Sequence, residues 1–162
     1  SVVFTGSKSL TDTINIDGQD IHIGKLVLSP TRTYLPVMKQ ILKECKNEIK
    51  GIIHCTGGAQ TKVKKFIGPV RVIKDQLFDI PPLFKVIKEE SGTPMKEMFE
   101  VFNMGHRMEF YTDSSTADKI ISISKAFGID AKLIGYVKED IKPAVEIHYD
   151  GEVYNYWLSL HS

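Results

Sequence analysis

The sequence lacks any long hydrophobic run. None of the apolar stretches in its 162 residues approaches the roughly 20 residues that a helix needs to cross a bilayer. Residues 1–6 also lack the charged region and the long apolar segment of a secretory signal peptide. They are typical of a sequence that begins inside a longer protein. We therefore expect a cytoplasmic protein that has no membrane partner.

An excess of charge of either sign is also missing, and cysteine is scarce. The net charge is only +1, so the overall charge gives no indication of a nucleic acid partner. The two cysteines, Cys45 and Cys55, are too few for a disulfide framework and are typical of free thiols in a cytosolic protein. With 42% hydrophobic residues, a chain of this length can bury one core, so we expect residues 1–162 to form one domain.

Sequence patterns of common metal and nucleotide sites are absent as well. There is no Walker A motif and no Rossmann fingerprint, which disfavours a kinase or ATPase of those classes. His54 and Cys55 are adjacent, so on a strand they face opposite sides and do not share a metal ion. We expect no metal site, a core position for His54 and a small buried residue in Cys55. The five histidines are scattered: His22, His54, His106, His148 and His161.

Hydrophobic periodicity and turn residues predict alternating strands and helices. Asp17-Gly18 and Asp150-Gly151 each indicate a two-residue hairpin turn. The Thr93-Pro94 pair predicts a helix capped by Thr93, and Ser114 or Ser115 is expected to cap a later helix. The expected strands are 13–16, 19–22, 51–55, 69–73, 107–112, 131–137, 145–149 and 152–158, and the expected helices are 34–46, 59–66, 81–90, one that follows Pro94, and 114–127. This order predicts an α+β fold, three-layer α/β/α with a mixed sheet, partly ferredoxin-like, with hairpins at both ends.

The segment His54-Cys55-Thr56-Gly57-Gly58 is the strongest local signal. A strand runs directly into two glycines and then into a helix, so a ligand can approach the bare backbone closely. Free N–H groups at the start of a helix favour an anion, and Lys62, Lys64 and Lys65 add positive charge. These features predict a phosphate site. The alternative is a tight structural turn beside a solvated lysine face.

Two further segments carry residues suited to an anion. Asn103 and Gly105 lie between a helix and a strand, where Asn103 offers donors and an acceptor and Arg107 can pair with phosphate. The alternative is a helix C-cap with a solvated Arg107. Arg32 precedes a helix among hydroxyl residues, which suits a modest anion site or a capping loop with Thr33 as the N-cap.

The three segments, taken in order, resemble the C-terminal domain of phosphoribosylformylglycinamidine cyclo-ligase (aminoimidazole ribonucleotide, or AIR, synthetase). In that family the stretches read approximately Pro-Thr-Arg-x-Tyr, His-x-Thr-Gly-Gly-Gly and Phe-Asn-x-Gly. The resemblance covers about residues 25–138. The matching stretches here are Leu28-Ser29-Pro30-Thr31-Arg32-Thr33-Tyr34, Ile53-His54-Cys55-Thr56-Gly57-Gly58 and Phe102-Asn103-Met104-Gly105, together with Ile80-Pro81-Pro82-Leu83-Phe84.

The resemblance implies an activity for the full-length protein. That reaction closes formylglycinamidine ribonucleotide to aminoimidazole ribonucleotide in purine biosynthesis, with ATP cleaved to ADP and phosphate. ATP activates the formyl oxygen, the amidine nitrogen attacks, and phosphate leaves, so positioning and charge stabilisation dominate. The family also implies a homodimer and an N-terminal domain that holds most of the ATP site and the Mg²⁺ carboxylates. No such domain is present in this chain, so we expect the chain alone to be inactive and to bind no cofactor.

The resemblance also implies which residues bind phosphate or substrate. Those residues are Arg32, His54, Thr56, Gly57, Gly58, Asn103 and Gly105, with supporting charge from Lys62, Lys64 and Arg107; no catalytic residue is assigned. Two positions depart from the family pattern: Ala59 replaces a third glycine, and Arg107 stands where a further glycine is expected. These departures leave two alternatives open: another ATP-using enzyme of the AIR synthase superfamily, or a non-catalytic nucleotide- or phosphate-binding module with the same fold.

Overall fold

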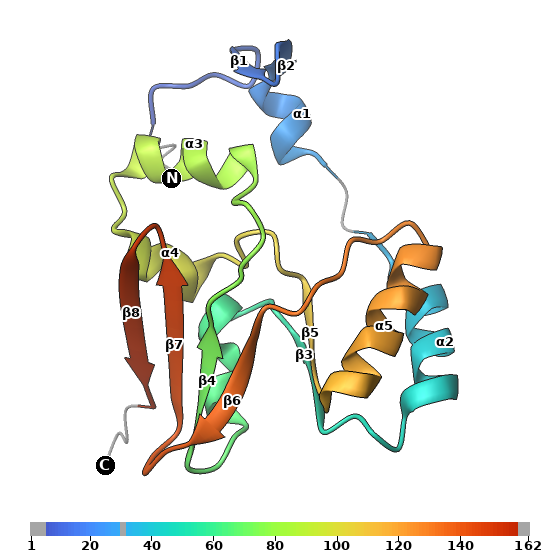
Figure 1. The fold of residues 1–162 in the computed structure, drawn as a ribbon. Helices are drawn as coiled ribbons and strands as arrows, with labels where there is room; N and C mark the ends of the chain where they lie inside the picture. Colours follow the sequence, from blue (N-terminus) through green and yellow to red (C-terminus); the bar gives the residue numbers. More distant parts are fainter. Residues whose placement is uncertain (1–5, 30–31, 159–162) are drawn as a thin grey trace.

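The computed structural model describes residues 6–29 and 32–158. Figure 1 shows their arrangement, with the N-terminal hairpin at one end and the strands and helices of the rest grouped below it. The elements are β1 (Thr13–Ile16), β2 (Gln19–His22), α1 (Ile23–Val27), α2 (Leu35–Cys45), β3 (Gly51–His54), the 3₁₀ helix η1 (Ala59–Lys65), β4 (Val70–Lys74), α3 (Pro82–Ser91), α4 (Met95–Val101), β5 (Met108–Tyr111), α5 (Ser114–Ala126), β6 (Gly135–Glu139), β7 (Ala144–Tyr149) and β8 (Glu152–Trp157). The predicted α+β class and both predicted hairpins are confirmed.

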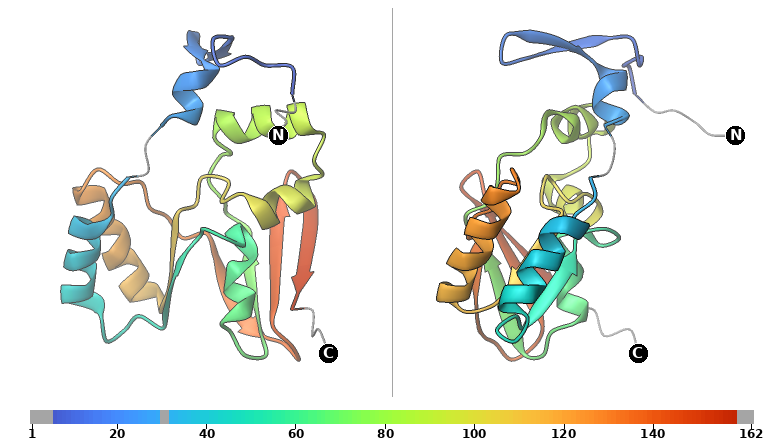
Figure 2. Two further views of the ribbon diagram at one scale, coloured as in Figure 1. Left: turned by 180° about the vertical axis from the view of Figure 1, so that it is seen from behind. Right: turned by 90° about the vertical axis from the view of Figure 1, so that its right-hand side faces the viewer.

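A four-stranded mixed sheet in the order β6-β4-β7-β8 carries the larger core. The central strands β4 and β7 run parallel, while β6 and β8 pair antiparallel to them. In this register Val72 and Val145 lie side by side, and both are buried. The helices η1 and α4 lie on one face of the sheet. The left view of Figure 2 shows this arrangement from behind. Their residues Val63, Met98 and Phe99 join the sheet's apolar side chains in one cluster.

The strands β3 and β5 form a separate antiparallel ladder beside this core. One face carries Ile53 and Tyr111, which pack against the core of the larger sheet. The other face carries Phe110, which packs against the cluster between α2 and α5. The ladder therefore lies between two cores, with α2 and α5 on its outer side (Figure 1). Because His54 pairs with Met108, the end of β3 and the start of β5 lie at the same end of the ladder.

The N-terminal hairpin β1–β2 leads into a helix that the sequence did not predict. This helix, α1, has only five residues, fewer than two turns, so its apolar spacing gives almost no periodic signal. Ile23 is its buried residue, and α1 packs against α3. No helix of the described ranges is both long and apolar enough to cross a membrane.

Most boundaries lie within two residues of their predictions, and three differences have a clear physical cause. Pro94, not Thr93, caps α4: its carbonyl accepts the Met98 N–H, while the Thr93 hydroxyl pairs with Ser91. Asp113, not Ser114 or Ser115, caps α5, because its carboxylate accepts the Thr116 N–H at 2.9 Å. The strand β6 begins at Gly135 and not at 131, since Gly135 lies opposite Lys74, the last residue of β4, and the preceding segment has no partner strand.

Candidate functional site

The three segments singled out in the sequence meet at the shared end of β3 and β5. The Cys55 N–H donates to the Arg107 carbonyl at 2.9 Å, which joins the glycine segment to the loop before β5. The Gln60 side-chain amide donates to the Asn103 carbonyl at 2.6 Å, which joins the same two segments a second time. The Arg107 Nη1 lies 3.4 Å from the Tyr34 hydroxyl, which brings in the segment before α2. Stretches that are up to 73 residues apart in the sequence thus form one surface.

The glycine segment makes a left-handed turn with an open backbone. Gly57, Gly58 and Ala59 have φ values of 59°, 95° and 44°. A left-handed conformation is easy for glycine and strained for alanine, which explains why a third glycine suits the Ala59 position. A Cβ on Gly57 would meet no atom within 4 Å, and neither the Gly57 nor the Gly58 N–H donates to an acceptor in the described residues. The turn therefore presents bare amides to its surroundings.

The side chains around the turn differ in exposure. His54 and Thr56 are exposed, and their side chains lie 3.4 Å apart between Nδ1 and Oγ1. The expected core position of His54 is therefore wrong, because β3 turns its last side chain out where the ladder ends. Cys55 is buried as predicted, and burial raises the pKa of its thiol to about 12. A thiol with that pKa is not a nucleophile at neutral pH.

The predicted lysines have different positions. Lys62 spans the turn, with its ammonium 3.0 Å from the His54 carbonyl and 2.8 Å from the Thr56 carbonyl. Its charge is thereby fixed beside the bare amides. Lys64 instead pairs with Glu100 at 3.5 Å and lies over the Tyr156 ring, and Lys65 is exposed. Only Lys62 of the three therefore supports the turn directly.

The loop from Asn103 to Arg107 is held by hydrogen bonds among its own residues. The Asn103 side-chain oxygen accepts the Gly105 N–H at 2.9 Å, and the Asn103 carbonyl accepts the His106 N–H at 2.9 Å. Gly105 has φ 95°, and a Cβ there would lie 3.0 Å from the Pro81 ring, so this position requires glycine. Arg107 follows with an exposed side chain.

The first segment is only partly described. Pro30 and Thr31 lie outside the described residues, and Arg32 is exposed. The expected N-cap role of Thr33 is wrong, because Tyr34 is the N-cap residue of α2 and makes no side-chain cap. Tyr34 instead reaches the Arg107 side chain, as described above.

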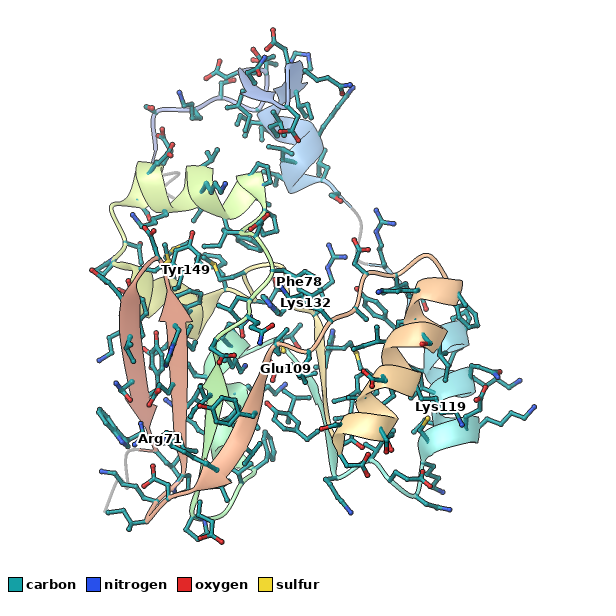
Figure 3. All side chains as sticks on the ribbon, in the orientation of Figure 1. Arg71, Phe78, Glu109, Lys119, Lys132 and Tyr149 are labelled. Atoms are coloured by element: carbon teal, nitrogen blue, oxygen red, sulfur yellow. The ribbon has the colours of Figure 1, made fainter. Side chains whose placement is uncertain are left out.

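A buried polar network underlies the two loops, and the sequence did not predict it. The Lys74 ammonium, 1% exposed, pairs with the Glu109 carboxylate and donates to Gln60. The other Glu109 oxygen accepts the Tyr111 hydroxyl at 2.6 Å. Burial, followed by the charge of Glu109 and this hydrogen bond, raises the pKa of Tyr111. Figure 3 shows Glu109 between the small ladder and the larger sheet. In the sequence, Lys74 and Glu109 occupy strand positions 35 residues apart, so only the tertiary fold reveals the pair.

His106 is a second buried polar residue at this site. Its Nε2 accepts the Phe78 N–H at 3.1 Å, so in the neutral ring the proton is on Nδ1. The buried Nδ1 has no hydrogen-bond partner among the described residues. Burial, and next the charge of Lys74, lower the pKa of His106 from 6.5 to about 4, and Glu109 opposes them.

This lowered pKa predicts a loss of stability in mild acid. The unfolded chain takes up a proton on His106 near pH 6.5 and the folded chain only near pH 4, so the folded state loses stability as pH falls through this window. The full shift corresponds to about 3 kcal/mol. In the wild type, the free energy of unfolding measured with urea should fall by about half of this amount between pH 7.5 and pH 5. His106→Phe should remove most of the difference, and His22→Gln, at an exposed histidine, should retain it. If His106→Phe loses as much stability between pH 7.5 and pH 5 as the wild type, the acid sensitivity does not come from His106.

The site is an open edge and not an enclosed pocket. A shallow groove lies elsewhere, lined by Lys88, Met95, Tyr149 and Tyr154, and none of the candidate residues lines it. Across the described ranges, no three His, Cys, Asp or Glu side chains are grouped to hold a metal ion. The bare amides, Lys62 and Arg107 fit phosphate oxygens.

Comparison with known proteins identifies the family. The sequence model of the family described as AIR synthase related protein, C-terminal domain, matches residues 6–148. The chain belongs to this family. It is 35% identical over 150 residues to the phosphoribosylformylglycinamidine cyclo-ligase of Methanococcus vannielii, which covers 86% of this chain and 42% of that protein. The enzyme of the same name from Methanopyrus kandleri is 29% identical over 160 residues, covering 93% of this chain and 45% of that protein.

The chain thus spans less than half of the length of these relatives. Among solved structures, the hydrogenase maturation protein HypE of E. coli superposes with a TM-score of 0.54 over 80% of this chain and 40% of HypE. The sequence identity is 18%, so this similarity supports the fold alone. It supports the α+β assignment.

Proposed function

We propose that this chain is the C-terminal domain of an ATP-dependent cyclo-ligase that converts formylglycinamidine ribonucleotide to aminoimidazole ribonucleotide. One observation carries the proposal: the three family segments, distant in sequence, meet at the end of the β3–β5 ladder around an open turn of bare amides. The names of the relatives supply the reaction. ATP and Mg²⁺ would be held mainly by an N-terminal domain, and a homodimer in the cytoplasm is part of the proposal.

Every candidate residue except Lys64, which pairs with Glu100, has a role in this proposal. The Gly57 and Gly58 amides donate to phosphate oxygens, and Lys62 holds positive charge next to them. Arg32 and Arg107 supply guanidinium groups that match phosphate in a bidentate manner. His54, Thr56, Asn103 and Gly105 complete the surface. Such groups bind and orient the phosphorylated substrate, and orientation is what phosphoryl transfer chiefly requires.

An activity assay tests the proposal. The full-length protein that contains this chain, given ATP, Mg²⁺ and formylglycinamidine ribonucleotide, should release ADP only when the ribonucleotide is present. Aminoimidazole ribonucleotide should form in equal amount. ADP release that does not depend on the ribonucleotide would contradict the proposal. A complete lack of ADP release in the presence of the ribonucleotide would also contradict it.

A phosphate-binding module without catalysis is the second candidate. Arg107, in place of a family glycine, places a bulky charged side chain at the site and contacts Tyr34, which favours altered recognition. A module of this kind would bind the ribonucleotide in a calorimetric titration but release no ADP. The two candidates therefore give opposite results in the activity assay.

A further inference from the structure

We infer that a buried series of contacts, from Lys74 through Gln60 to Asn103, fixes the distance between the glycine turn and the loop from Asn103 to Arg107. Lys74 and Gln60 are then positioning residues of the candidate site, although neither reaches its surface. The inference rests on the proposed function for its effect on activity, but the contacts themselves can be tested without it.

The contacts follow one direction from the core to the loop. The Lys74 ammonium, already paired with Glu109, lies 2.7 Å from the Gln60 carbonyl and 3.0 Å from the Gln60 side-chain oxygen. An ammonium has three N–H donors, so all of them are used. Because Lys74 donates to the Gln60 oxygen, the orientation of that amide is fixed and its NH₂ faces the Asn103 carbonyl at 2.6 Å.

Both ends of this series of contacts belong to the candidate site. Gln60 is the second residue of η1, directly after the left-handed turn, and it is 0% exposed. The Asn103 carbonyl also accepts the His106 N–H, and the Asn103 side chain accepts the Gly105 N–H. A displacement of Gln60 would therefore move the loop that presents Gly105 and Arg107 relative to the Gly57 and Gly58 amides.

A role in packing alone does not explain the arrangement. Well-packed hydrophobic residues often stabilise a core as much as a buried ion pair does. Hydrogen bonds with fixed directions, in contrast, specify one arrangement of the groups they join. At the junction of two loops that lie outside the sheet ladders, that specificity determines the geometry of the surface.

Amide hydrogen exchange on the 162-residue chain tests the contact itself. Gln60→Met keeps the side-chain volume and the backbone carbonyl that Lys74 contacts, but it removes the bond to Asn103. We expect the Gly105 and His106 amides to exchange about tenfold faster, with the Val145 amide in the core unchanged. Gln40→Met, the same change at a partly exposed glutamine of α2, should leave all three amides unchanged. Unaltered exchange at Gly105 and His106 in Gln60→Met would overturn the inference.

Steady-state kinetics on the full-length protein test the consequence. Since misplacement by about 1 Å can cost up to about 100-fold in rate, we expect Gln60→Met to lower kcat about 10- to 100-fold with a smaller effect on the KM for ATP. Gln40→Met should remain within about twofold of the wild type. An unchanged kcat, despite faster exchange, would overturn the positioning role. If the wild type itself lacks the activity, the proposed function fails and the exchange result alone decides on the contact.

Discussion

Valine in place of Gly57 is expected to lower kcat/KM of the full-length protein by about 100-fold or more, while the chain still folds. The Gly57 N–H donates to no acceptor in the described residues, and a Cβ there would meet none of their atoms within 4 Å. The space that a ligand needs is the space that the branched side chain would fill. Displacement of a bound phosphate by even about 1 Å is enough for an effect of this size.

The control must carry the same backbone strain. Gly57 has φ 59°, where a branched residue is disfavoured, so some loss of stability is expected from conformation alone. Gly151, in the β7–β8 turn, has φ 76° and equally open surroundings. Gly151→Val should show a comparable fall in melting temperature and activity within about threefold of the wild type. Equal activities of the two variants would mean that the glycine turn is structural only.

Local signals were enough to predict most of the elements. Apolar spacing predicted α2, whose Val37, Ile41 and Cys45 are buried, because a helix repeats its core face every three to four residues. Asp17-Gly18 and Asp150-Gly151 predicted both hairpins, because a tight turn needs left-handed residues and all four have positive φ. Gly57-Gly58 predicted the glycine turn for the same reason, because both residues have positive φ.

Features that depend on long-range contacts were not predicted from local signals. No local signal indicated that β3 and β5 form a ladder of their own, because the packing of both faces determines which strands pair. His54 was expected in the core because its strand is apolar, but the ladder ends at His54 and leaves it exposed. The role of Lys64 also depends on a distant partner, Glu100.

The buried pair of Lys74 and Glu109 leads to the largest expected loss of stability. Their side chains are 1% and 4% exposed, so neither charge is compensated by water. Lys74→Met leaves the Glu109 carboxylate buried without its cation, and removal of one partner of such a pair typically costs about 3–5 kcal/mol. Urea unfolding at pH 7.5 should therefore show a loss of about that size. Lys119→Met, which breaks an exposed pair with Glu44 at 3.2 Å, should cost far less, because solvent screens an exposed ion pair.

A second variant separates the charge from the packing. In Lys74→Met/Glu109→Gln the buried carboxylate is neutral, and the amide oxygen still accepts the Tyr111 hydroxyl. Because the cost of Lys74→Met comes mainly from the unpaired charge, the double variant should be more stable than the single one by about 1–3 kcal/mol. It should nevertheless lack the donor that orients Gln60, so its Gly105 and His106 amides should exchange as fast as those of Gln60→Met. A double variant that is no more stable than Lys74→Met would contradict the view that Lys74 compensates the Glu109 charge.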